Sequence, residues 1–379
     1  MDLDFTPAEE AFRAEARGWL HAHVPATPLP SLETKEGFAA HRAWEAQLAA
    51  DRWSVVSWPE EYGGRGADIV RWLLFEEEYY AAGAPGRVGQ NGISLLAPTL
   101  LDHGTREQRA RVLPSMATGE VVWAQAWSEP EAGSDLASLT SRAVRTGGGW
   151  LLSGQKTWSS RAAFADRAFG LFRSEPDTPK PQQGLTYLMF DLRAPGVTVR
   201  PIGRLDGKPA FAELFLDEVF VPDEDVIGEP GQGWRVAMST AGNERGLTLR
   251  SPGRFLAAAD RLLNLWRTQG SSQAARDRVA DAVIGARAYQ LFTYANASRF
   301  LDGESIGPES SLNKVFWSEY DIALYETALE LLGVDGELAD TDWAEGYVFA
   351  LAGPIYAGTN EIQRDIIAER LLGLPKGRR

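Results

Sequence analysis

The spacing of apolar residues changes twice along the 379-residue chain, and this order limits the folds open to it. From about 6 to 120 they recur as in amphipathic helices, beginning after Thr6-Pro7, which resembles a helix start. From about 121 to 230, short runs rich in β-branched and aromatic residues alternate with Gly, Pro and Asp. Helical spacing then returns after Gly231-Gln232-Gly233. This order predicts an α+β protein with an inserted β domain, not a βαβ dinucleotide-binding fold.

We expect three domains: an N-terminal helical domain (1–120), a middle β domain of barrel-like or sandwich form (121–232) and a C-terminal four-helix bundle (233–379). The clearest expected strands are 150–154, 168–172, 185–191, 197–201 and 212–220. The clearest expected helices are 69–80, 93–101, 106–116, 234–245 and onward, 272–300, 310–332 and 360–372.

Composition excludes several classes of protein. A net charge of −14 is unsuited to nucleic acid, whose phosphates are neutralised by Lys and Arg. With no cysteine, disulfides and thiol chemistry are absent. No apolar run reaches the ~20 residues of a membrane span, and the acidic N-terminus does not resemble a secretory signal, so a cytoplasmic protein is expected. The four histidines have no metal-site spacing, and we expect them on the surface and no metal: His21, His23, His41 and His103.

Two segments of the middle region have residues suited to binding a ligand. In Trp127–Asp135 a glycine, Gly133, permits close approach to the backbone, and Ser128 and Ser134 provide hydroxyl groups. In 154–160, Trp158 and Ser160 are two residues apart, so on a regular strand they would share one face. An ordinary polar loop and an ordinary core tryptophan are the alternatives.

A third segment, 355–364, reads Ile-Tyr-Ala-Gly-Thr-Asn-Glu-Ile-Gln-Arg. Together the three segments resemble motifs of the acyl-CoA dehydrogenase family, over nearly the whole chain. The resemblance implies an FAD-dependent enzyme that converts an acyl thioester to its trans-2-enoyl form. It assigns FAD contacts to Trp127, Ser128, Gly133, Ser134, Trp158, Ser159, Ser160, Thr359 and Glu361. It assigns substrate contacts to Ser134, Arg245, Tyr356, Ala357 and Gly358.

One position departs from the commonest family pattern. Where that pattern has the catalytic Glu, this chain has Ala357. Family members resembling isovaleryl- and long-chain acyl-CoA dehydrogenases carry the Glu on the first helix after the β domain, immediately before an Arg. The matching residue here is Glu244, followed by Arg245. The resemblance therefore implies that Glu244 removes the α-proton while the β-hydrogen leaves as hydride to flavin N5, and that the Ala357 amide still binds the thioester carbonyl.

The family's usual contacts to the adenine end of FAD are not all present. An R-x-x-F-G segment is missing after Leu262, and a Q-x-x-G-G stretch has become Glu330-Leu331-Leu332-Gly333-Val334. A homotetramer with different contacts is the expected assembly, and a heterotetramer whose second chain completes the site is the alternative. The other rival functions are a flavin oxidase or monooxygenase and a non-catalytic subunit. Electron-transfer flavoprotein is the acceptor that the family implies, and acyl carrier protein could replace CoA as the carrier.

Overall fold

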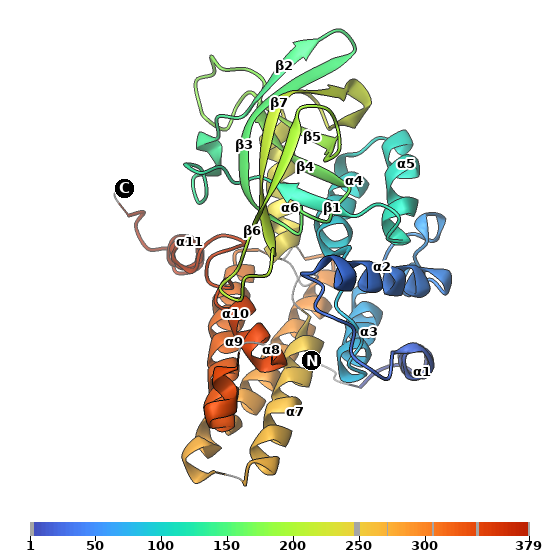
Figure 1. The fold of residues 1–379 in the computed structure, drawn as a ribbon, viewed down its shortest axis with the longest axis vertical. Coiled ribbons are helices and arrows are strands. Elements are labelled where there is room, and N and C mark those ends of the chain that lie inside the picture. Colours follow the sequence, from blue (N-terminus) through green and yellow to red (C-terminus); the bar gives the residue numbers. More distant parts are fainter. Residues whose placement is uncertain (1–3, 246–250, 271, 305–306, 339–340, 378–379) are drawn as a thin grey trace. The chain divides into compact units, whose positions relative to one another are not determined.

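The computed structural model describes residues 4–245, 251–270, 272–304, 307–338 and 341–377, with the side chains of 243–245 outside the description. The chain divides into two compact units. A β unit comprises Thr27–Gly66 and Pro85–Glu244, and a helical unit comprises Met1–Ala26, Ala67–Ala84 and Arg245–Arg379. The ribbon of each unit can be followed by colour in Figure 1.

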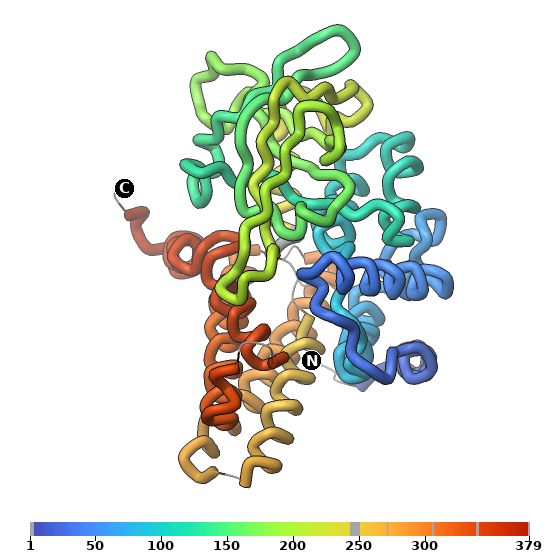
Figure 2. The backbone as a smooth tube through the Cα atoms, in the orientation of Figure 1, coloured from blue at the N-terminus to red at the C-terminus, as the bar shows by residue number. Residues whose placement is uncertain are grey.

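The β unit is built on one eight-stranded sheet with the order β6-β7-β3-β2-β4-β5-β8, and β1 pairs with β4. Neighbouring strands are antiparallel except β1 with β4 and the single pair between β2 and β4. The strands are β1 (Trp123–Ala126), β2 (Arg142–Thr146), β3 (Gly149–Ser160), β4 (Arg167–Arg173), β5 (Leu185–Asp191), β6 (Val197–Ile202), β7 (Phe211–Pro222) and β8 (Val226–Ile227). The 174–184 loop, which connects β4 to β5, is visible in Figure 2.

The prediction of an α+β fold is confirmed, and the long β strands lie where the sequence places them. Three strands were missed, among them the two-residue β8. β1 has only four residues, and β2 exposes both of its arginines, so neither has a period that stands out. β2 is a strand because it pairs with β3 through five residue pairs, from Arg142–Ser153 to Thr146–Gly149. This pairing is a tertiary contact that the local pattern does not contain.

The helices of the β unit pack on the sheet in two apolar clusters. They are α2 (Lys35–Ala50), α4 (Ala97–His103), α5 (Arg106–Ala117) and α6 (Gly233–Arg245), with a π-helical turn, Gly92–Leu96, before α4. Phe38 of α2 belongs to one cluster, and residues of α4, α5 and α6 belong to the other. Leu96, Leu113 and Phe169 are fully buried in the second of these clusters. The glycines before α6 form a turn, as predicted, with Gly228 and Gly231 at φ 70° and 78°.

The helical unit contains α1 (Pro7–His23), α3 (Ile69–Ala81), α7 (Pro252–Thr268), α8 (Arg276–Leu301), α9 (Ser310–Leu332), α10 (Asp342–Ala350) and α11 (Asn360–Ile366). Helices α7, α8, α9 and α10 pack around Phe255, Leu262 and Leu324, which are buried. Thr6 caps α1 through a capping box with Glu9, and Gly333 ends α9 at φ 58°. None of the described helices is long and apolar enough to cross a membrane.

The expectation of a solvated His41 was wrong, and two consecutive glutamates, which are usually solvated on a helix, are buried as well. Glu77 and Glu78 of α3 are buried, because they face α1 and α8. Glu78 binds Arg13 and Arg17, and these bonds lower its pKa although burial opposes the shift. Burial raises the pKa of Glu77, which accepts hydrogen bonds from Gln290 and Tyr294.

His41 is also buried rather than solvated. Its ring nitrogens lie 2.8 Å from the carbonyl oxygen of Gly86 and 3.0 Å from that of Pro30. The ring therefore connects α2 to two loops within the β unit. A lone histidine on a helix gives no signal in the sequence for such a role.

Two helical glycines should respond in opposite ways to substitution by alanine. A Cβ at Gly253 would lie 2.6 Å from the carbonyl oxygen of Glu76, so Gly253→Ala must push α7 away from α3 and should destabilise by about 1–3 kcal/mol. A Cβ at Gly18 would meet nothing within 4 Å, so Gly18→Ala should stabilise by about 0.5–1 kcal/mol through helix propensity. Urea denaturation measures both changes, and equal effects of the same sign would contradict this close packing.

Candidate functional site

Lys156 joins the two candidate ligand-binding segments of the β unit. Its ammonium group is fully buried and donates to Glu129 Oε1 at 2.9 Å, to the Leu171 carbonyl at 2.8 Å and to the Trp127 carbonyl at 3.3 Å. Three acceptors match its three N–H donors. One residue later, the Thr157 amide donates to the Ser128 carbonyl at 2.9 Å. The Trp127–Asp135 loop is thereby fixed to β3.

Glu129 is the buried partner of this lysine. Both of its oxygens are occupied, since the Ser141 amide donates to Oε1 while the amide and hydroxyl of Thr140 donate to Oε2. Burial alone would raise the pKa of Glu129, but the Lys156 charge and these donors lower it to about 2. The carboxylate is therefore ionised across the physiological range.

Trp158 lies at an irregular point of β3. The register with β7 shifts between Lys156 and Ser159, and Trp158 has φ 58°. This bulge leaves the indole 60% exposed, with only an edge contact to Phe211 at 5.9 Å between ring centroids. The strand is not regular here, so the face that Trp158 and Ser160 share cannot be argued from strand period alone.

Two serines follow Trp158 in the chain, and the Trp127–Asp135 loop carries two more. Ser159 is buried, and its Oγ has no hydrogen-bond partner among the described residues. Ser160 is half-buried. In the neighbouring loop Gly133 and Ser134 are exposed, and a Cβ at Gly133 would meet nothing within 4 Å. A large uncovered aromatic face beside an unpaired buried hydroxyl is suited to a flat, polar-edged ring system.

The third segment belongs to the helical unit. Ala357 and Gly358 both adopt left-handed φ, 56° and 79°. The Gln363 side-chain amide donates to the Ala357 carbonyl at 2.9 Å, which stabilises the turn. Thr359 then caps α11 by accepting from the Ile362 amide at 3.3 Å. Among the described residues, none accepts a hydrogen bond from the Ala357 amide.

A buried polar group holds the start of α11 in place. Lys314 of α9 donates to Asn360 Oδ1 at 2.8 Å, and Ser318 donates to the same oxygen at 3.1 Å. Glu361 is exposed, and its own backbone amide and Thr359 lower its pKa.

The predicted residues fall in both units. Trp127, Ser128, Gly133, Ser134 and Trp158–Ser160 belong to the β unit, and Tyr356–Glu361 belong to the helical unit. Glu244 and Arg245 are the last two residues of α6, and their side chains lie outside the described residues.

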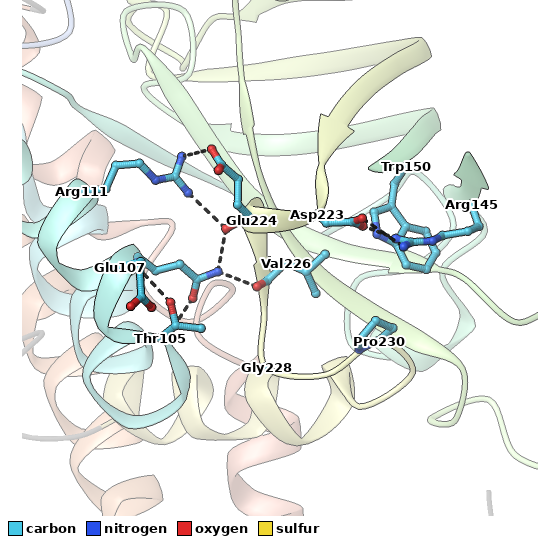
Figure 3. Close-up of a pocket in the computed structure, with 11 residues that line it drawn as sticks. Thr105, Glu107, Arg111, Arg145, Trp150, Asp223, Glu224, Val226, Gly228 and Pro230 are labelled. Atoms are coloured by element: carbon cyan, nitrogen blue, oxygen red, sulfur yellow. Dashed lines mark hydrogen bonds and ion pairs between the residues drawn. The ribbon is translucent and has the colours of Figure 1, made fainter. Parts of the chain in front are cut away.

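A separate pocket of about 810 Å³ lies beside the start of α5 (Figure 3). Its charged side chains are engaged with one another: Arg145 binds Asp223, and Arg111 lies 3.3 Å from Glu224. Trp150 lines the same pocket, with Arg145 5.0 Å from its ring centroid. Of the predicted site residues that the structure describes, none lines this pocket.

Comparisons with known proteins agree on one family. Models of the acyl-CoA dehydrogenase N-terminal, middle and C-terminal domains match residues 6–120, 124–219 and 231–372. Acyl-CoA dehydrogenase IpdE1 of Mycobacterium tuberculosis is 38% identical, over 97% of this chain and 98% of the relative. Acyl-CoA dehydrogenase FadE26 of the same organism is 30% identical over the whole of both chains.

Solved structures agree with these sequence matches. One described as the Tcur3481-Tcur3483 steroid ACAD has a TM-score of 0.87, with 27% identity over the whole of both chains. The ChsE4-ChsE5 complex from Mycobacterium tuberculosis has a TM-score of 0.83 with 29% identity, again over both whole chains. The chain belongs to the acyl-CoA dehydrogenase family. It is therefore a flavoprotein oxidoreductase that uses FAD to dehydrogenate an acyl-CoA.

The described residues fit FAD and give no sign of a metal. The exposed Trp158 indole and the unpaired Ser159 hydroxyl are consistent with a flavin ring covering this part of β3. Among the described residues, no three His, Asp or Glu side chains come together as metal ligands would.

The sequence analysis assigned no role to three residues that stabilise the candidate binding segments. Glu129, Lys156 and Gln363 stand inside the quoted segments but were not predicted to have a role. Their signal is weak, because a lone Glu or Lys is usually solvated. Only pairing across the fold shows that they are buried.

The Lys156–Glu129 pair should contribute stability that depends on pH. The pKa of Glu129 falls from 4.5 to about 2 on folding, so its contribution is present above pH 4.5 and is lost as the pH falls towards 2. Glu129→Gln leaves the lysine charge buried and unpaired, so at pH 7 it should lower the free energy of unfolding by about 3–5 kcal/mol. Denaturant titrations from pH 7 to 3 should show the difference from the parent shrinking.

Asp223→Asn is the matched control, because it removes an exposed carboxylate of the same unit from its ion pair with Arg145. Its cost should be below about 1 kcal/mol. If Glu129→Gln lowers the free energy of unfolding by no more than Asp223→Asn does, the buried pair does not make the stabilising contribution expected of it.

Proposed function

We propose that Glu244 is the base that removes the α-proton of the acyl-CoA. The observation that carries this proposal is Ala357, which occupies the usual position of the family's base in the turn before α11 and has no carboxylate. Proton removal from a weakly acidic C–H requires a base within reach. Glu244 stands at the alternative position that some family members use, immediately before Arg245.

The helical period of α6 supports this assignment. Its buried residues are Val236, Ala237, Thr240 and Ala241, which form one inward face. Position 244 follows Thr240 by four residues, one helical turn further along the same face. A carboxylate with little access to water has a raised pKa, and a higher pKa makes it a stronger base.

The Ala357 amide is proposed to bind the thioester carbonyl, where negative charge develops. The left-handed turn at Ala357 and Gly358 needs no side chain for this task, because the donor belongs to the backbone. Gln363 holds the Ala357 carbonyl and thereby fixes the orientation of the next peptide unit. FAD supplies the hydride acceptor when bound, and Trp158 is proposed to cover one face of its ring system. Ser128, Ser134, Ser159, Ser160, Thr359 and Glu361 are proposed as further FAD contacts.

We propose a bulky or branched acyl group as substrate, with Ser134, Arg245, Tyr356 and Gly358 beside the thioester. This choice is supported by the 27% identical structure that is described as a steroid ACAD, and it agrees with the proposed base on α6. Flavin bleaching with linear, branched and alicyclic acyl-CoAs tests it. A preference for a linear acyl chain would contradict it. Electron-transfer flavoprotein is the proposed electron acceptor.

Glu244→Gln should retain FAD but lose reduction by substrate. A general base contributes about 100- to 10,000-fold to the rate, so anaerobic flavin bleaching by a good acyl-CoA should slow by that factor. Glu36→Gln, an exposed carboxylate in the first turn of α2, is the control and should be reduced at the parent rate. Reduction of Glu244→Gln at the parent rate would show that the base lies elsewhere.

We propose that the chain has three domains, 1–120, 121–232 and 233–379. We also propose that four chains assemble as a tetramer. Large apolar side chains stand exposed on α8 and α9 and support a subunit interface there: Ile284, Leu291, Phe292, Phe300, Leu301, Leu312 and Phe316. A homotetramer must hold the FAD adenine without the usual motif, and Glu330 is instead paired with Arg278 at 2.5 Å. Two similar structures carry two protein names each, which supports a heterotetramer.

The amount of FAD per chain separates these two assemblies. Protein expressed alone should contain close to one FAD per chain if it forms a homotetramer. If a second kind of chain completes the site, the protein alone should contain far less. Flavin absorbance after gel filtration gives both the flavin content and the size of the assembly.

A further inference from the structure

A line of hydrogen-bonded side chains crosses the core of the β unit. The Trp127 indole N–H lies 3.1 Å from the Tyr187 hydroxyl, which lies 3.3 Å from Thr240 Oγ1. Thr240 Oγ1 lies 2.7 Å from Thr99 Oγ1, which donates to the Leu95 carbonyl at 2.7 Å. Tyr187, Thr240 and Thr99 are each fully buried.

The two ends of this line fix its direction. An indole N–H can only donate and a carbonyl can only accept. One hydrogen per hydroxyl then satisfies all four contacts when Trp127 donates to Tyr187, Tyr187 to Thr240, Thr240 to Thr99 and Thr99 to Leu95. The remaining contact, from Thr240 to the Val236 carbonyl at 3.2 Å, is an alternative within α6.

The line connects the proposed flavin-binding loop to α6, the helix that contains Glu244. Trp127 immediately precedes Ser128, and its carbonyl accepts from Lys156. Tyr187 belongs to β5, Thr99 to α4 and Thr240 to α6. Thr240 precedes Glu244 by one helical turn.

Among the described side chains of α6, Thr240 alone makes buried hydrogen bonds to other elements, since the bond from Ser239 to Asp102 is exposed. The other buried side chains of the helix, those of Val236, Ala237 and Ala241, are apolar. Contacts of small apolar groups tolerate sliding and rotation, whereas hydrogen bonds depend on distance and angle. A buried hydroxyl without a hydrogen-bond partner costs free energy. A position of α6 that satisfies every hydroxyl in the line is therefore favoured over positions that break one of these bonds.

We propose that Tyr187 and Thr240 are positioning residues, which set α6, and with it Glu244, against the flavin-binding loop at Trp127. This inference rests on the proposed role of Glu244. The expected effect lies in the chemical step, because a base misplaced by about 1 Å can cost about 100-fold in rate. Substrate binding and flavin content do not depend on it.

Tyr187→Phe and Thr240→Val each remove one hydroxyl and keep the shape of the side chain. Each should slow anaerobic flavin reduction by about 10- to 100-fold per bound flavin, with KM and FAD per chain unchanged. Deuterium at the substrate α-carbon should slow the variants by a larger factor than it slows the parent, because proton removal becomes the slower step. Thr240→Ser keeps the hydroxyl and should restore the rate.

Matched controls remove equivalent hydroxyls outside the line. Thr293 is fully buried in α8 and donates to the Tyr289 carbonyl at 2.8 Å, so Thr293→Val repeats the change made at Thr240. Tyr320 donates to the Ala282 carbonyl at 2.7 Å, so Tyr320→Phe repeats the change made at Tyr187. Both controls should keep the parent rate and isotope effect. If Tyr187→Phe does not fold, the comparison of Thr240→Val, Thr240→Ser and Thr293→Val still decides.

The outcomes separate this inference from the proposed function. If Glu244→Gln is not reduced while Thr240→Val is reduced as fast as Thr293→Val, the base stands and the positioning role is overturned. If Glu244→Gln itself is reduced at the parent rate, the proposed function fails and the inference fails with it. A Thr240→Val variant that is less stable but has the parent rate and isotope effect also overturns the positioning role.

Discussion

The buried ion pair of Lys156 and Glu129 holds the ligand-binding part of the β unit in one arrangement. Every N–H of the ammonium group and both oxygens of the carboxylate have partners, and these partners come from β4, the start of β2 and the Trp127–Asp135 loop. A buried charge must be paired. If one of these segments moved, the Lys156 ammonium or the Glu129 carboxylate would remain buried without a partner. The segments proposed to bind the flavin therefore have a rigid support.

Two irregular backbone positions orient groups that the ion pair does not contact. The bulge in β3 turns Trp158 outwards, and the left-handed turn at Ala357 directs a peptide unit in the helical unit. Both are positions of positive φ occupied by residues other than glycine, which is uncommon and is maintained only where the surroundings enforce it. Ion pairing at Lys156 and the Gln363 amide provide that enforcement.

The inner face of α6 bears on the proposal that the catalytic base lies on this helix. A base on this helix needs a fixed helix, and the line from Trp127 through Tyr187 and Thr240 supplies directional contacts one turn before Glu244. The turn at Ala357 keeps its backbone donor and needs no carboxylate. Division of these tasks between side chain and backbone is consistent with the loss of the usual glutamate.

The sequence by itself determined the helical, β, helical order, the long strands β5 and β7, the three ligand-binding motifs and the absence of the usual base at Ala357. Periodicity and short motifs are local, so they can be read without a fold. Tertiary structure decided which polar residues are buried: Lys156, Glu129, Glu77 and Glu78 look like solvated charges until partners distant in sequence surround them. It also decided the strand β2 and the bulge at Trp158, because both depend on pairing with a neighbouring strand.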